Sequence, residues 1–182
     1  MPDDEQVMVQ VQAGRIEMLA ILFERHHIRL FNFFLRLTAN RQLSEDLTQE
    51  LFLRILKYRQ TYRGESKFST WMYQIARNLH IDNLRSRRPE MPIDDLYEEK
   101  PSPQPCPAQK AESQQEADLL ARALERLPLR KREVLLLSRF QNLKYQEIAG
   151  LLKCSVENVK VLVHRALKEL RGHYLDLQGG TQ

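Results

Sequence analysis

The chain has 182 residues, of which 42% are hydrophobic and 29% are charged, with a formal net charge of +4 and a pI near 9.1. This length suits one domain or two small ones and excludes a large enzyme core. The mildly basic balance permits a polyanionic partner without requiring one.

The N-terminal sequence MPDDEQVMVQ is acidic and lacks the basic-then-apolar order of a signal peptide. No apolar run approaches the roughly 20 residues needed to span a bilayer. The two cysteines, Cys106 and Cys154, lie far apart, so we expect neither a disulfide framework nor a paired CxxC metal site. These features predict a cytoplasmic protein with no metal and no cofactor.

Apolar residues recur at three- and four-residue spacing, and strand-type alternation is scarce, which predicts an all-α fold. The first helix should run from about Ile16 to Thr38. His26 and His27 lie within it, and no matching Cys/His cluster accompanies them. We therefore interpret both as surface or interhelical residues rather than metal ligands.

A second helix is predicted to start at Ser44, a good N-cap, and to continue through Lys57. Its apolar positions would face inward: Leu47, Leu51, Phe52 and Ile55. Helical spacing then leaves an outer ridge of Asp46, Gln49, Glu50, Leu53 and Lys57. An exposed leucine among acids is a mild indication of a protein-docking face, and an ordinary solvated ridge is the alternative.

The loop Tyr62–Lys67 is polar, and Ser66 or Ser69 can cap the helix that follows it, FSTWMYQIARNLHIDNLRSRR. Its predicted core side contains Phe68, Met72, Ile75 and Leu79, flanked by Trp71. Its opposite side would carry Tyr73, Gln74, Arg77, His80 and Arg88, with Arg85 and Arg87 at the edges and an unexplained Leu84. That side could be a solvated face, or a nucleic-acid surface with cations for phosphates and rings for unstacked bases. Phe68 and Trp71 fit either the core or the ligand-facing surface.

Between Arg88 and Gln115 the sequence becomes proline-rich and acidic, which predicts an extended linker between two helical domains. Its acidic centre, IDDLYEEK, either stays solvated, which we favour, or rests against a basic surface.

Beyond the linker, one helix should end at Leu127-Pro128, and another should cover Arg130 to Phe140. The next stretch, KYQEIAGLLKCSVENVKVLVHRALKELR, fits a helix-turn-helix whose second helix is capped by Ser155 and enters the major groove. Its inward positions would be Ile148, Ala149, Leu152, Val159, Val163, Ala166, Leu167 and Leu170. Its outward, net cationic face would be Glu157, Lys160, Val161, His164, Arg165, Lys168 and Arg171, although a bundle with a solvated charged face is the alternative.

The turn departs from its usual pattern, because Lys153 stands where glycine is common. A left-handed backbone would cost this residue roughly 1 kcal/mol. We interpret Cys154 beside it as a small apolar packing residue, with a redox switch as a minor alternative.

From about Ile16 to Arg171 the chain resembles the extracytoplasmic-function (ECF) group of bacterial sigma factors. The resemblance rests on SEDLTQELFLRI, YRGESKFSTWMYQIARNLHIDNLRSRR and LERLPLRKREVLLLSRFQNLKYQEIAGLLKCSVENVKVLVHRALKEL, in that order. It implies a sigma2 domain over 1–90, a linker over 91–115, a sigma4 helix-turn-helix domain over 116–176 and a tail over 177–182.

By position, the resemblance implies three sets of site residues. The set for the coiled coil of the polymerase β′ subunit is Asp46, Gln49, Glu50 and Leu53. The set for the promoter −10 element is Tyr62, Arg63, Lys67, Phe68, Ser69, Trp71, Arg77, Asn78, Asp82, Arg85 and Arg88, with the Tyr62–Lys67 loop taking a flipped base. The set for the −35 element is Ser155, Glu157, Asn158, Lys160, Val161, His164, Arg165 and Lys168. Leu162 stands where family members often carry arginine, which removes one expected DNA contact or places a packing residue at the edge of the helix pair.

The implied function is that of a non-enzymatic alternative sigma factor. It would bind core RNA polymerase through the β′ coiled coil and the β subunit, recognise and melt promoter DNA, and take no small-molecule substrate. The resemblance also implies an anti-sigma protein, often membrane-bound, that would hold the chain at the inner face of the membrane. A stand-alone helix-turn-helix regulator is the alternative, but it explains only the second half. An enzyme acting on nucleic acid is weaker still, because Glu50, His80 and Asp82 form no metal-ligand or nucleophile–base set.

Overall fold

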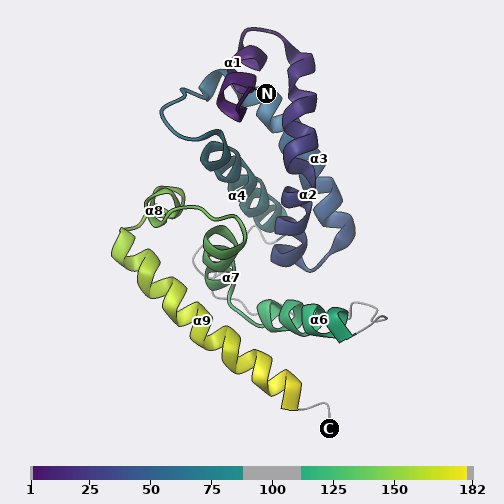
Figure 1. Cartoon of the computed structure of the whole chain (residues 1–182), viewed down its shortest axis with the longest axis vertical. Helices are drawn as coiled ribbons and strands as arrows, with labels where there is room; N and C mark the ends of the chain where they lie inside the picture. The colour runs from purple at the N-terminus through teal and green to yellow at the C-terminus, as the bar shows by residue number, and fades with distance from the viewer. Residues whose placement is uncertain (1, 88–111, 180–182) are drawn as a thin grey trace. The chain divides into compact units, whose positions relative to one another are not determined.

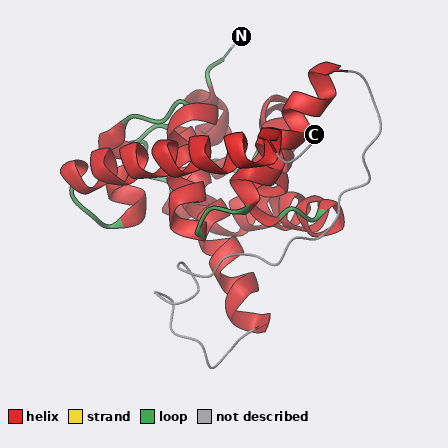
Figure 2. Cartoon of the chain, turned by 90° about the horizontal axis from the view of Figure 1, so that it is seen from below, coloured by secondary structure: helices red, strands yellow, loops and turns green. Residues whose placement is uncertain are grey.

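The computed structural model describes residues 2–87 and 112–179. These residues form helices joined by loops, and no strand occurs among them (Figure 2). The all-α prediction is therefore confirmed. The described residues group into two compact units, one of residues 2–35 and 40–87 and the other of residues 36–39 and 112–179.

The first unit is built from four helices and two 3₁₀ turns (Figure 1). In chain order they are α1 (Asp4–Gln12), η1 (Ile16–Met18), α2 (Leu19–Thr38), α3 (Arg41–Tyr58), η2 (Arg59–Thr61) and α4 (Phe68–Arg87). Their apolar faces meet in one core, and its most completely buried side chains include Leu22, Leu30, Phe33, Phe34, Leu51, Ile55, Phe68 and Met72. The predicted inward positions of α3 and α4 are buried as expected.

Helix α1 is an element that the sequence pattern did not predict. Asp3 caps it, because the Asp3 carboxylate accepts from Gln6 N–H while the Gln6 side chain accepts from Asp3 N–H. Val7, Met8 and Val11 are fully buried along one side of α1. The N-terminal segment is therefore part of the core of the first unit.

The predicted start of α3 at Ser44 is wrong, since the helix begins at Arg41 with Asn40 as its N-cap. The Asn40 side chain accepts from the Leu43 N–H at 2.9 Å. Ser44 is fully buried within the helix, and its hydroxyl donates to the Asn40 carbonyl four residues back. Asp46 thus lies in the second turn of α3 rather than in its first.

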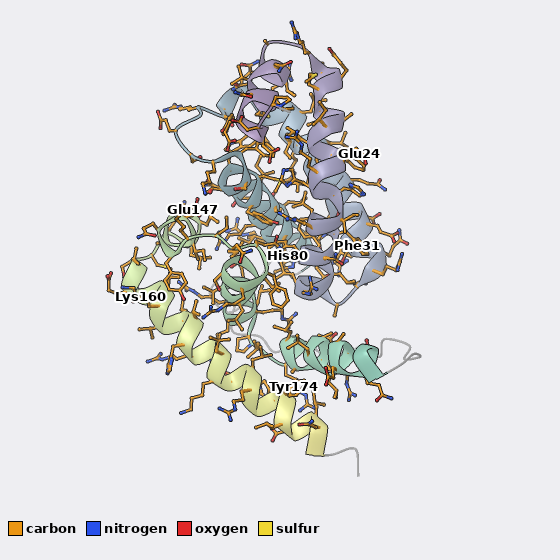
Figure 3. The ribbon with its side chains drawn as sticks, viewed as in Figure 1. Glu24, Phe31, His80, Glu147, Lys160 and Tyr174 are labelled. Carbon is orange, nitrogen blue, oxygen red and sulfur yellow. The ribbon has the colours of Figure 1, made fainter. Side chains whose placement is uncertain are left out.

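The prediction that Tyr73 and His80 belong to an exposed basic-aromatic face is also wrong. Both side chains are buried in α4, where Figure 3 labels His80. The Tyr73 ring packs edge-on against Phe33 of α2 with 5.3 Å between ring centroids, and burial raises the pKa of its hydroxyl. The start of α4 differs as well. In place of a serine cap, Glu5 of α1 accepts the Phe68 N–H.

The second unit contains α6 (Glu112–Glu125), α7 (Leu129–Leu135), the π-helical turn η3 (Leu136–Phe140), α8 (Tyr145–Leu152) and α9 (Val156–Gly179). Helix α9 packs against α6, α7 and α8. The inward positions predicted for the last two helices are buried, with two exceptions. Leu167 is exposed because it lies beside the buried stripe of Val159, Val163 and Ala166, and Leu170, which continues that stripe, is half-buried.

Several predictions fall outside the described residues: most of the linker, Cys106, Arg88 and the last three residues. Within 2–87 and 112–179, no helix has both the length and the apolar character of a membrane span.

Candidate functional site

The turn between α8 and α9 has the geometry of a helix-turn-helix. Helix α8 ends at Leu152, and its C-cap residue Lys153 has a left-handed backbone at φ 52° and ψ 47°. The Cys154 N–H then donates back to the Ala149 carbonyl at 3.0 Å, which satisfies one of the last carbonyls of α8. The Ser155 hydroxyl accepts from the Asn158 N–H at 3.1 Å and caps α9. The predicted cap and turn are thus confirmed, and the Ser155 hydroxyl already makes a hydrogen bond within the protein.

Helix α9 presents a continuous exposed face at its N-terminal half, where Figure 3 labels Lys160. The exposed residues are those predicted from the helical spacing: Glu157, Asn158, Lys160, Val161, His164, Arg165, Lys168 and Arg171. The four lysines and arginines outnumber the one glutamate. The second half of α9 is held to α7 by an ion pair between Lys131 and Glu169. Leu162 is half-buried, in keeping with a packing position at the edge of the helix pair.

The ridge of α3 lies on the surface of the first unit. Asp46, Gln49 and Lys57 are exposed, and Leu53 is 63% exposed. Glu50 is half-buried and accepts from Arg54 at 3.1 Å. Leu53 is thus a single large apolar side chain within an otherwise polar ridge.

The exposed stripe of α4 is polar and becomes basic at its end. Gln74, Asn78, Asp82 and Arg85 follow one another at helical spacing and are exposed, and Arg87 lies beyond them. Ser69, Trp71 and Arg77 are half-buried beside this stripe. The preceding loop adds Arg63 and Lys67, both exposed. Cations therefore flank α4 at both ends, although its middle is not the basic-aromatic face that we predicted.

The aromatic residues at the start of α4 form a packed cluster. Tyr62 and Phe68 are buried, and the Tyr62 ring lies 5.4 Å from that of Trp71. The Tyr62 hydroxyl donates to the Ser66 carbonyl, and burial raises its pKa. Of the rings predicted to face DNA, only Trp71 keeps part of its surface exposed. Tyr62 and Phe68 thus support the loop from within.

Arg54 is a residue that we did not single out from the sequence. Its guanidinium donates to Glu50 on α3 and, at 2.7 Å, to Asp82 on α4. The hydrogen bond to Asp82 is the main reason that the pKa of Arg54 is raised. Arg54 therefore joins the ridge of α3 to the exposed stripe of α4. The i, i+4 spacing from Glu50 was the available sequence signal.

Among residues 2–87 and 112–179, no group of three or more His, Cys, Asp or Glu side chains is arranged to hold a metal ion. Cys154 is half-buried in the turn, as expected of a packing residue.

Comparison with known families identifies both units. Residues 22–90 match Sigma-70 region 2, and residues 117–170 match Sigma-70 region 4. Among individual relatives, the ECF sigma factor SigM of Bacillus subtilis is 30% identical over 158 residues, which cover 84% of this chain and 93% of SigM. SigE of Mycolicibacterium smegmatis is 34% identical over 156 residues, but the chain spans only 60% of the length of SigE.

These matches define a sigma factor with regions 2 and 4. The chain belongs to the ECF group of RNA polymerase sigma factors. It is an alternative sigma factor, which binds core RNA polymerase and promoter DNA in transcription initiation, and its relatives are DNA-binding regulators rather than enzymes. A stand-alone helix-turn-helix regulator would not carry region 2.

Two solved structures share the fold. The structure of CnrH in complex with the cytosolic domain of CnrY has a TM-score of 0.70 at 20% identity, and covers 98% of this chain and 99% of that one. The sigma factor RpoE of Bartonella quintana, solved with the anti-sigma factor NepR, has a TM-score of 0.64 at 20% identity, with 90% and 98% covered.

Proposed function

We propose that this sigma factor divides initiation between its two units. Residues 1–90 would dock on core polymerase and capture the −10 element, residues 116–176 would read the −35 element, and 91–115 would connect them. The observation that carries this proposal is the presence in one chain of two separate helices, α4 and α9, each with exposed cations. A protein that read a single DNA element would need only one such helix.

The proposed polymerase contact is the α3 ridge of Asp46, Gln49, Glu50 and Leu53. Leu53 supplies apolar area that is exposed in the free chain and would be buried against a β′ helix, while Asp46 and Gln49 supply polar contacts at its border. Asp46 is the ridge carboxylate that would favour a basic group on the partner, because Glu50 is already paired with Arg54.

The proposed −10 surface is the loop over 63–67 with the exposed stripe of α4. Arg63 and Lys67 before the helix, and Arg85 in its last turn, can follow a phosphate backbone along about 26 Å of helix. Asn78 between them can donate to base edges or sugars, and Trp71 offers the ring surface on which a base can stack.

Melting follows from selective capture of unpaired bases. Unpairing and unstacking one base costs a few kcal/mol, and stacking or pocket contacts return about 1–3 kcal/mol for each base held. A surface that binds only the separated strand therefore shifts the opening equilibrium without consuming a nucleotide. The exposed 63–67 loop is the proposed position of the captured base.

The proposed −35 contact is the exposed face of α9 in the major groove. Lys160, Arg165 and Lys168 can reach phosphates or guanine edges, and Val161 can contact a thymine methyl group. Ser155 and Asn158 lie at the N-terminus of this helix, where backbone N–H groups favour a phosphate.

We further propose that the protein works in the cytoplasm, where RNA polymerase acts, and that an anti-sigma protein holds it inactive. RpoE of Bartonella quintana was crystallised with the anti-sigma factor NepR. In this chain the exposed α3 ridge is the surface that such an inhibitor would compete for.

Run-off transcription with purified core polymerase tests the proposed function. Promoters would be taken from sequencing of polymerase-bound DNA. The full chain should direct synthesis from one defined start, and replacing either the −10 or the −35 element should abolish it. Failure to direct synthesis, or synthesis that ignores one of the two elements, would contradict the proposed division.

A further inference from the structure

The loop over 63–67 is exposed along its whole length, yet both of its ends are fixed. Tyr62 precedes the loop and Phe68 follows it, and both side chains are buried. Gly64, the second residue of the loop, adopts a positive φ of 71°, a conformation that residues with side chains rarely adopt. The shape of these five residues therefore depends on what holds the two buried neighbours.

The first end is held by Gln12, the last residue of α1. Its side-chain amide donates to the Tyr62 carbonyl at 2.6 Å and to the Arg59 carbonyl at 2.8 Å. The Gln60 side chain donates back to the Gln12 carbonyl at 2.9 Å. Three hydrogen bonds thus join the end of α1 to the backbone and side chains just before the loop.

The second end is held by Glu5, in the first turn of the same helix. Its carboxylate accepts from the Phe68 N–H at 2.9 Å, so it caps α4 at the residue where the loop ends. A carboxylate is favourable at this position, because the unpaired N–H groups and the helix dipole attract negative charge.

Helix α1 is itself firmly anchored. Val7, Met8 and Val11 are fully buried. Asp4 accepts from Arg25 at 2.7 Å and pairs with His26 at 2.6 Å, and both partners lie on α2. Burial acts to raise the pKa of Asp4, but the hydrogen bonds from Arg25 and His26 outweigh it and lower that pKa. Gln12 and Glu5, which hold the loop, therefore lie on a helix that is itself fixed by apolar burial and by the contacts of Asp4 with α2.

We propose that α1 is a positioning element for promoter reading: Gln12 and Glu5 hold the 63–67 loop in the shape that accepts an unpaired base. This inference rests on the proposed −10 function of the loop and assigns no DNA contact to α1. A loop that is already in its binding shape loses less conformational entropy on binding, and it can discriminate between bases only while its walls are fixed.

The experiment uses holoenzyme assembled from core polymerase and the full chain. Single-stranded DNA carrying the −10 element of an active promoter is bound, and each base is replaced in turn by an abasic site. With the wild-type chain, one position should weaken binding by about tenfold when its base is removed. The variants are Gln12→Leu and Glu5→Leu, because a leucine side chain can neither donate to the Tyr62 and Arg59 carbonyls nor accept from the Phe68 N–H. Gln10→Leu is the matched control on α1, because Gln10 accepts only from the exposed Arg15.

Support for the proposal is a loss of base discrimination. In both variants the tenfold difference should fall towards one, while binding to the abasic strand stays at the wild-type level and Gln10→Leu behaves as wild type. An unchanged difference in the variants would overturn the proposal. An equal loss on both strands would also overturn it, because that result indicates a purely structural role. A wild-type chain that transcribes but shows no sensitive position would overturn it too, whereas a wild-type chain that fails in run-off transcription contradicts the proposed function itself.

Discussion

At the scale of single residues, Lys153 illustrates a local cost built into the helix-turn-helix. Its left-handed backbone, at φ 52°, disfavours any residue with a Cβ by about 1 kcal/mol. We predict that Lys153→Gly raises the free energy of unfolding by about 0.5–1 kcal/mol, since glycine removes this strain but gains some freedom in the unfolded chain. Urea denaturation measures the change.

Lys144→Gly is the control, because Lys144 has an ordinary φ of −69° and should give no gain. A gain at both positions, or at neither, would contradict the prediction.

Asp46 is the residue at which the docking proposal is most directly tested. It is exposed on the α3 ridge and away from the core, so reversing its charge should not disturb the fold. We predict that Asp46→Arg weakens association with core polymerase by at least about tenfold, with an unchanged circular dichroism spectrum and melting temperature. Analytical size exclusion or fluorescence anisotropy with labelled chain gives the affinity.

The control for that experiment is Glu17→Arg, which makes the same charge reversal at an exposed position of η1. Association should survive this change. Retained association of the Asp46 variant would remove the ridge from the polymerase contact. Equal weakening by both variants would indicate a general effect of charge rather than a contact.

At the scale of elements, Arg54 joins α3 and α4 through ion pairs with Glu50 and Asp82. The Asp82 side chain is about half exposed, so the contribution of the pair to stability should be small. We predict a coupling free energy of about 0.2–1 kcal/mol between Arg54→Ala and Asp82→Ala in a double-mutant cycle measured by urea unfolding. Strict additivity of the two substitutions would show that the pair does not act in solution. It would then leave Asp82 free for a direct role at DNA.

The long helices could be predicted from the sequence, whereas the short N-terminal helix α1 could not. Helices α2, α3 and α4 were expected within a few residues at each end, because each is long and has apolar residues at three- and four-residue spacing. The start of α9 was expected as well, but this helix continues to Gly179, beyond the predicted pattern that ended at Arg171. Helix α1 was missed, since its few apolar residues lie among acids and amides. Its only local signal was the Asp3–Gln6 capping pair.

The errors in the candidate site have a physical reason as well. A helical wheel assumes one buried side, but α4 packs against α1 as well as α3, and Tyr73 on α4 contacts Phe33 of α2. Tyr73 and His80 are therefore buried where a solvated face was expected. Likewise, Ser44 and Asn40 are both good caps, and only the tertiary fold decides between them. In α9 near the turn, the residues predicted to be exposed are exposed.

At the scale of the whole molecule, the proposal places two small DNA-reading surfaces in one chain. Each surface alone presents few cations, so the free protein should bind promoter DNA weakly. Polymerase would fix the spacing of the two units and convert the second contact into an intramolecular one, with a gain in affinity that needs no new contact. Promoter binding and its dependence on salt should therefore be measured with the holoenzyme rather than with the free chain.

Salt dependence reports how many phosphates the holoenzyme neutralises through this chain. The logarithm of the binding constant falls with the logarithm of salt concentration by about 0.9 for each phosphate contact on duplex DNA. We predict that Lys168→Ala on the exposed face of α9 makes this slope shallower by about 0.9 on a −35 duplex promoter.

Arg122→Ala, at an exposed position of α6, should leave the slope unchanged. Filter binding or anisotropy between about 50 and 200 mM salt covers the range in which the slope is readily measured. An unchanged slope with Lys168→Ala would exclude that lysine from the phosphate contacts. An equal change of slope with Arg122→Ala would show that the salt dependence comes from the long-range charge of the unit rather than from α9.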